Sequence, residues 1–422
     1  MAFGNADRRM RLKEAVLACF REPASTVAER LREFTEEDWR KNLYWLDVSG
    51  LALYCFDRLA LLGVEHCLPV SIQDRLKRNL ADNRERTAAL LHETVAITAA
   101  LEQASIQAAI LKGVTLFPDS VPDLALRSQV DIDFLIRGWD ALKAKDVILG
   151  LGYQLDAIKG LEWSFTAGTD QAMGIESIYK VRPQRMVELH LLALSENVAT
   201  PVVDDLLTRA VARRSLGMVL PGLSPADILV QQARHIFKHL CSEQTRAHWV
   251  LEYWRHVQTR RGDLYFWRDV ESIAKNEPDG PMAVGAVTLL ATLLFGRFAP
   301  QQLTQWSLAP LSPAVRLWIE TYGRRVLLSD FPTSKFYLFL RRELHLEGEM
   351  QSRSPWRFLL PFHLWSARVT RGKAGEGLRA RLTRYRVELK HAFFRVRFHL
   401  RTSLPYEVES RRWQRRMAGK QP

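Results

Sequence analysis

Two short stretches decide the fold, Ile110-Leu111-Lys112-Gly113 and Arg127-Ser128-Gln129-Val130-Asp131-Ile132-Asp133. The apolar run at 106–111 predicts a buried strand, after which Lys112-Gly113 turns the chain toward the start of a helix. In the second stretch Asp131 and Asp133 alternate with apolar residues, which indicates a strand with both carboxylates on one face. Because like charges on one face repel, the pair predicts a cation between them.

A third carboxylate is expected from the strand predicted over residues 185–192, where Glu188 and His190 face the same side. Mg²⁺ prefers carboxylate oxygens and water as ligands. The sequence therefore predicts that Asp131, Asp133 and Glu188 are catalytic residues and ligands of Mg²⁺. The alternative for Glu188 is a strand residue that simply faces solvent, and His190 either orients Glu188 or only lines the same face.

Three further residues are expected to bind the phosphates of a nucleotide. Lys112 ends the first strand and Arg127 lies four residues before Asp131, so both are predicted to contact phosphate oxygens. Gly113 lies where the backbone must approach a neighbour closely. The alternative for Lys112 is a salt bridge to Asp131 or Asp133.

The chain of 422 residues is too long for one hydrophobic core. Helical periodicity dominates on both sides of the strand patterns. We therefore predict an α+β fold in which a small mixed β-sheet core at 105–195 is flanked by a helical region at 1–104 and a helical domain at 196–350. A basic tail follows at 351–422.

The composition favours a folded protein of a reducing compartment. The four cysteines are scattered, without the spacing of a disulfide framework or a zinc site. The first residues lack the apolar core of a secretory signal. The longest apolar run, 282–296, is shorter than the roughly 20 residues that cross a bilayer, which predicts a buried helix. We expect a cytoplasmic protein, with membrane-peripheral attachment through the tail as an alternative.

Positive charge is concentrated in the tail. Residues 351–422 hold 18 of the 60 Lys and Arg residues but four of the 47 acidic ones, which gives this segment a net charge of +14. The whole chain has a net charge of +13, so the rest of the chain is close to neutral. Within the tail, arginines are interspersed with Leu, Val, Phe and Tyr. The favoured interpretation is a solvated basic helix whose apolar stripe packs on the body, and the alternatives are binding to an anionic membrane, a nucleic acid or an acidic protein.

The order of four motifs resembles a family of uncharacterised bacterial nucleotidyltransferases with a DNA polymerase β-like core. These motifs are Ile110–Gly113, Leu126–Ile136, Leu149–Tyr153 and Val187–His190. The resemblance covers roughly residues 75–260. It implies that Asp131 and Asp133 are the metal-binding pair and Glu188 the third carboxylate.

The same resemblance places Lys112-Gly113 where the wider superfamily has Gly-Ser. We therefore expect an Mg²⁺-dependent enzyme that moves a nucleotidyl group from an NTP to an unknown hydroxyl acceptor, which is a small molecule, a glycan, a peptide or a tRNA. The alternative is a catalytically idle scaffold or adaptor whose basic tail binds an anionic surface.

Overall fold

A computed structural model describes residues 2–168, 177–192, 206–215, 217–330, 334–344 and 378–419. The predicted boundaries at 195 and 350 lie outside these ranges, as does the first part of the basic tail. The chain separates into two compact units. The first comprises Met1–Phe237 and Arg246–Pro310, and the second comprises Lys238–Thr245 and Leu311–Pro422.

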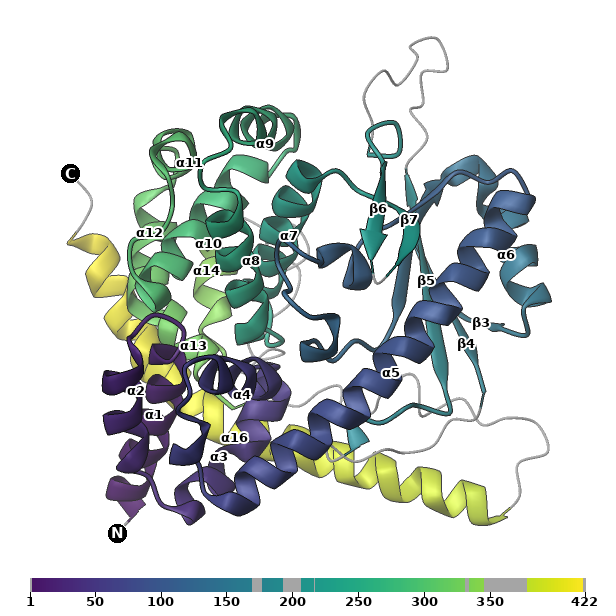
Figure 1. The fold of residues 1–422 in the computed structure, drawn as a ribbon. Helices are drawn as coiled ribbons and strands as arrows, with labels where there is room; N and C mark the ends of the chain where they lie inside the picture. The colour runs from purple at the N-terminus through teal and green to yellow at the C-terminus, as the bar shows by residue number, and fades with distance from the viewer. Residues whose placement is uncertain are drawn as a thin grey trace. The chain divides into compact units, whose positions relative to one another are not determined.

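A seven-stranded mixed sheet forms the centre of the first unit (Figure 1). Its strands are β1 (Ala108–Ile110), β2 (Ile132–Arg137), β3 (Gln154–Lys159), β4 (Glu162–Ala167), β5 (Arg185–Leu192), β6 (Val211–Ser215) and β7 (Met218–Gly222). The strand order is β3-β4-β5-β2-β1-β7-β6. The neighbours β2 and β5 run parallel, as do β1 and β7, and the other pairs are antiparallel. The predicted α+β fold with a small mixed sheet is confirmed.

The two central strands differ in burial: the residues of β2 are buried on both faces, whereas those of β5 alternate. Phe134 of β2 and the β5 residues Val187 and Leu189 are fully buried, while Glu188 and His190 point to the other side and are partly exposed. A strand with an apolar face against the core and a polar face toward a site gives this period of two. The strand predicted over residues 185–192 is β5 itself.

Strands β6 and β7 lie within residues 196–350, where the sequence predicted a helical domain, and correct that expectation. Each strand has five residues, and β7 is joined to β1 by the single register pair Ile110 and Gly222. Five residues carry little periodic signal, so the pairing with a strand more than 100 residues earlier decides their conformation. The helix expected to start after Gly113 is a single 3₁₀ turn, Gly113–Leu116.

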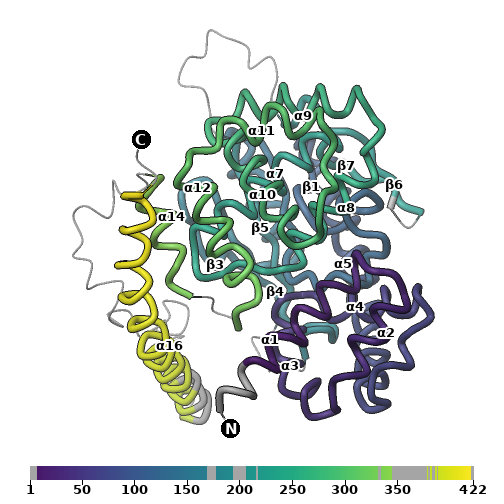
Figure 2. The backbone as a smooth tube through the Cα atoms, turned by 90° about the vertical axis from the view of Figure 1, so that its left-hand side faces the viewer, coloured from purple at the N-terminus to yellow at the C-terminus, as the bar shows by residue number. Residues whose placement is uncertain are grey.

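Among the described residues, five α-helices precede the sheet in the chain. α1 (Ala2–Ala18), α2 (Ala24–Arg32), α3 (Glu36–Ser49) and α4 (Ala52–Leu61) gather into one cluster, seen in purple in Figure 2. The long α5 (Val70–Gln103) then contacts β1 and α6 (Ala141–Gly150). Since α5 also packs against the turn at Leu124–Leu126, it connects the helical cluster with the loop that leads into β2.

A second group of helices follows β7. It consists of α7 (Pro225–Leu240), α8 (Ala247–Thr259), α9 (Leu264–Asn276), α10 (Gly280–Phe295) and α11 (Gln301–Ser307). The apolar run at 282–296 is α10, whose Val284 and Leu290 are fully buried, as the sequence predicted. In the part of the chain that the structure describes, no helix has the length and apolar character needed to cross a membrane.

The second unit is helical. It contains α12 (Pro313–Trp318), α13 (Arg324–Leu327), α14 (Tyr337–Glu343) and the 41-residue α16 (Leu378–Ala418). An aromatic cluster joins them: the ring of Trp413 on α16 stacks on Phe339 at 5.9 Å and lies 5.8 Å from Tyr322. The second half of α16 is thus part of the core of this unit, and the predicted tail helix is present. The expected packing of its apolar stripe is wrong for the first half of α16, where Leu378, Leu382 and Leu389 are exposed.

Candidate active site

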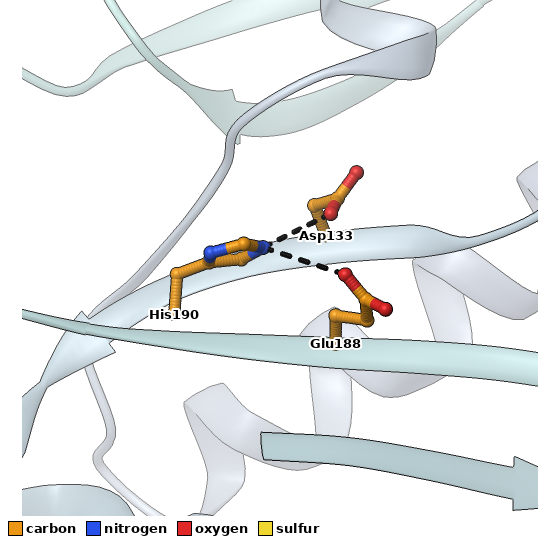
Figure 3. Close-up of side chains that lie close together, drawn as sticks. All are labelled: Asp133, Glu188 and His190. Atoms are coloured by element: carbon orange, nitrogen blue, oxygen red, sulfur yellow. Dashed lines mark hydrogen bonds and ion pairs between the residues drawn. The ribbon is translucent and has the colours of Figure 1, made fainter. Parts of the chain in front are cut away.

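The parallel pairing of β2 and β5 brings two of the three predicted catalytic residues, Asp133 and Glu188, together with His190, and Asp131 is not part of this group. Asp133 is directly opposite Glu188 in the register, and His190 lies two residues further along β5. Figure 3 shows the three side chains converging from the two strands. One ligand atom from each of Asp133, Glu188 and His190 lies within 4.8 Å of the other two, and no comparable group is found elsewhere among the described residues.

Asp133 is the centre of this cluster. Its side chain is 2% exposed, and its Oδ1 lies 3.2 Å from the Nζ of Lys112 and 3.0 Å from the Nε2 of His190. The same Nε2 lies 3.8 Å from Oε2 of Glu188. The salt bridge considered for Lys112 is therefore present, to Asp133. His190 is closer to Asp133 than to Glu188, so it orients the Asp133 carboxylate rather than that of Glu188.

Asp131 lies one residue before β2 begins, and its carboxylate interacts electrostatically with the other two. Burial and the charge of Asp133 raise the pKa of Asp131, against the opposing effect of Lys112 and Arg127. Burial followed by the charges of Asp133 and Asp131 raises the pKa of Glu188 to about 7. The charges of the carboxylates therefore act on one another.

Asp133 behaves in the opposite way. Burial alone would raise the pKa of this carboxyl group, but Lys112 and His190 outweigh burial and hold it well below its usual range. Asp133 is consequently an anion whose orientation is set by two donors. A cluster of carboxylates with one imidazole is a donor set that suits a divalent cation, and Mg²⁺ prefers its carboxylate oxygens.

Gly113 makes the close approach that the sequence predicted, and its neighbour is Gln129. The residue has φ +71°, and a Cβ added to it would lie 2.2 Å from the side-chain amide of Gln129. The Nε2 of Gln129 donates to the carbonyl oxygen of Asp131 at 2.6 Å. The amide side chain of Gln129 therefore contacts both the turn after β1 and the loop before β2. Its hydrogen bond to the Asp131 backbone positions that residue.

We expect Gly113→Ala to destabilise the protein by more than the about 1–2 kcal/mol that a positive φ costs an alanine, because the methyl group also displaces Gln129. Gly160→Ala is the matched control, since Gly160 has φ +59° with open space around it. Thermal unfolding of both variants measures the difference. Equal losses of stability would contradict the contact, and Gln129→Ala should relieve the excess in the Gly113→Ala background.

Arg127 contacts protein in this structure. Its Nε lies 3.1 Å from Oε1 of Glu252 on α8, and the hydroxyl of Tyr54 on α4 donates to the same oxygen at 2.8 Å. The Glu252 side chain is 2% exposed and that of Arg127 13%. Three elements far apart in sequence meet at this buried pair. The predicted contact of Arg127 with phosphate stays a prediction.

Helix α5 holds the loop that carries these residues. The Nδ2 of the fully buried Asn83 donates to the carbonyl oxygens of Ala125 at 2.6 Å and of Arg127 at 3.2 Å. One helical turn later, Arg86 donates to the carbonyl oxygens of Gln129 and of Ile178. Side-chain donors thus satisfy backbone acceptors that no strand partner reaches.

Sequence reasoning missed the residues that support the site. Asn83, Arg86 and Tyr54 lie within helices whose pattern shows only amphipathic packing, and Glu252 lies 125 residues after Arg127, the loop residue that it contacts. No local signal distinguishes them from ordinary helix residues. Burial of a charged or amide side chain is a tertiary property, so their partners became visible only in the fold.

Comparison with known proteins shows the family of the chain. None of the curated proteins matches it. Among solved structures it is similar to the antibiotic-resistance factor ANT(2'')-Ia, with 14% identity and a TM-score of 0.30 over 46% of this chain and 93% of that one. The model of the family described as "Uncharacterised nucleotidyltransferase" matches residues 35–296, more than half of the chain. The resemblance seen in the sequence motifs is thereby confirmed, and the chain belongs to this uncharacterised nucleotidyltransferase family.

Proposed function

We propose that this protein transfers a nucleotidyl group from an NTP to a hydroxyl acceptor with the help of Mg²⁺. The observation that carries the proposal is the convergence of Asp133 and Glu188 on neighbouring parallel strands, with Asp131 one residue before the first of them. Asp131, Asp133 and Glu188 would hold the metal. Bound Mg²⁺ would neutralise triphosphate charge and orient the reacting oxygens.

The residues of the chain divide the remaining work. Lys112 and the backbone at Gly113 are proposed to bind phosphate oxygens, with Arg127 beside them, and His190 positions Asp133. The acceptor hydroxyl oxygen forms a bond to the α-phosphorus while the bond from that phosphorus to the bridging oxygen of pyrophosphate breaks. The hydroxyl proton passes to the Glu188 carboxylate, so the products are the nucleotidylated acceptor and pyrophosphate.

Calorimetric titration of the full chain with each NTP tests this function. We expect heat of binding that depends on Mg²⁺ and that Asp131→Ala removes, because the variant loses a metal ligand. An unchanged nucleotide affinity in Asp131→Ala would contradict the proposed site. Absence of heat at millimolar nucleotide with the native chain would favour a catalytically idle scaffold.

A separate observation favours binding of an anionic membrane by the tail. The first half of α16 exposes Leu382, Leu389 and Phe393, which are 60%, 63% and 68% exposed. Their spacing of seven and four places them on one helical face. Exposed basic residues, Arg386 and Lys390 among them, flank that face. An apolar stripe beside cationic side chains is typical of helices that lie in a membrane interface.

We expect the full chain to bind vesicles that contain phosphatidylserine, and to release them as salt rises, because salt screens the attraction. Leu389→Asp should weaken this binding, while Leu264→Asp, at an equally exposed leucine on α9, should not. Sedimentation with vesicles measures both. Equal binding to pure phosphatidylcholine vesicles, self-association through the stripe, or a preference for nucleic acid would each contradict a lipid partner.

The proposed location is the cytoplasm, with part of the protein at the membrane. The four cysteines, all within the described ranges, are present as thiols. Thiols are the usual form in a reducing compartment.

A further inference from the structure

A cavity of about 340 Å³ lies between α5 and the segment that leads into β5. One wall is formed by α5, with Leu90 and Glu93, and the opposite wall by the segment that leads into β5, with Val181. Val130, which directly precedes Asp131, also lines it. The cavity therefore lies near Asp131, whose charge also acts on two of its lining residues, Arg86 and Arg182. Its volume is at the lower end of the range for small-molecule pockets.

Two of the three arginines in the lining already have partners. Arg185 forms an ion pair with Glu93 at 2.8 Å and lies over the ring of Tyr153 at 5.2 Å. Arg86 donates to two backbone carbonyl oxygens, as described above. These two side chains build the walls of the cavity.

Arg182 differs from both. Its guanidinium forms no hydrogen bond or ion pair with any residue that the structure describes, and its Nε is buried without a partner. Arg182 lies near Arg86, since burial and then the charge of Arg182 lower the pKa of Arg86 to about 10, against the charge of Asp131. Burial also lowers the pKa of Arg182 itself, and the charge of Asp131 again opposes this effect. A buried donor without a partner costs free energy, which an anion at this position would recover.

We propose that this cavity binds the acceptor of the transfer reaction, and that the acceptor is a hydroxyl compound with an anionic group, phosphate or carboxylate, held by Arg182. The planar guanidinium is suited to both groups. The inference rests on the proposed function. It separates acceptor from nucleotide because the lining includes Arg182 but not Lys112, Gly113 or Arg127, the residues expected at the triphosphate.

The geometry of the reaction agrees with this assignment. In nucleotidyl transfer the attacking oxygen and the leaving pyrophosphate lie roughly in line, on opposite sides of the α-phosphorus. With the triphosphate at Lys112, the acceptor must approach from another side of the carboxylates. The cavity is lined by Val130, which precedes Asp131, so an acceptor bound there would approach from that side. The anionic group of the acceptor, bound to Arg182, would orient the hydroxyl for attack.

Calorimetry with inorganic phosphate and with glycerol 3-phosphate tests the site on the full chain, without metal or NTP. We expect both ligands to bind and Arg182→Gln to weaken them about tenfold or more, the effect of losing one charge-assisted contact. Lys180→Gln is the matched control, since Lys180 is exposed, two residues away and of equal charge. Uncharged glycerol should not bind. Equal effects of the two substitutions, or no binding of phosphate by the native chain, would overturn the proposal.

A second arm repeats the titration with Mg²⁺ and a saturating NTP analogue that cannot be hydrolysed. Simultaneous binding of glycerol 3-phosphate supports an acceptor site. Displacement by the analogue would show that Arg182 serves the triphosphate and would overturn the acceptor assignment. If the analogue itself does not bind while Arg182-dependent phosphate binding persists, nucleotidyl transfer fails as the function, and the acceptor role fails with it although the anion site stands.

Discussion

Asp133→Asn is expected to lower the rate of nucleotidyl transfer by about a thousandfold, the order of effect seen when a preorganised electrostatic contact of a transition state is removed. Asp133 is the buried centre of the cluster and contacts both Lys112 and His190 through Oδ1. Asparagine keeps the shape but removes the negative charge, so affinity for the divalent cation falls and two donors lose their anion. Release of pyrophosphate from a Mg²⁺-bound NTP, with a mixture of hydroxyl acceptors, measures the rate.

The matched control for Asp133→Asn is Asp146→Asn. Asp146 is a 73% exposed residue of α6 that makes a surface ion pair with Lys145 at 3.5 Å. This substitution should leave the rate unchanged, and the melting temperature of both variants should show whether they are folded. A folded Asp133→Asn variant with native activity would remove Asp133 from the catalytic site.

The second large effect is expected at the buried ion pair of Arg127 and Glu252. Arg127→Met should lower the free energy of unfolding by about 3–5 kcal/mol, because it leaves Glu252 as a buried charge without its partner. Burial raises the pKa of Glu252, and Arg127 opposes this effect by stabilising the ionised carboxylate. Removing Arg127 therefore destabilises the charged form of Glu252. Thermal and urea unfolding of the full chain measure the loss.

Two variants make this prediction specific. Arg84→Met removes a surface ion pair, 4.0 Å from Asp123 and widely exposed, and should cost less than about 1 kcal/mol. The double variant Arg127→Met with Glu252→Leu should regain much of the stability, since no charge is left buried. A double variant that folds but loses nucleotide affinity would point to a phosphate contact of Arg127. Single and double variants of equal stability would contradict the pair.

Local sequence pattern was sufficient for the centre of the fold. The alternation of polar and apolar residues in 130–136 and 185–192 predicted β2 and β5, and the period of two placed Glu188 and His190 on one face. The long helical repeat before residue 104 predicted α5. These features depend on neighbours within a few residues, which is why they can be read from the chain.

The tertiary structure alone decided which residues meet. The parallel pairing of β2 with β5 sets Asp133 opposite Glu188 across 55 residues, and β7 joins β1 across more than 100. The partners of Arg127 come from α4 and α8, and the cavity at Arg182 from α5 and the approach to β5. Such contacts arise from the packing of distant elements, and their charges are buried only when those elements assemble. The sequence by itself therefore determined the carboxylates and their strands, whereas tertiary packing decided which side chains surround and support them.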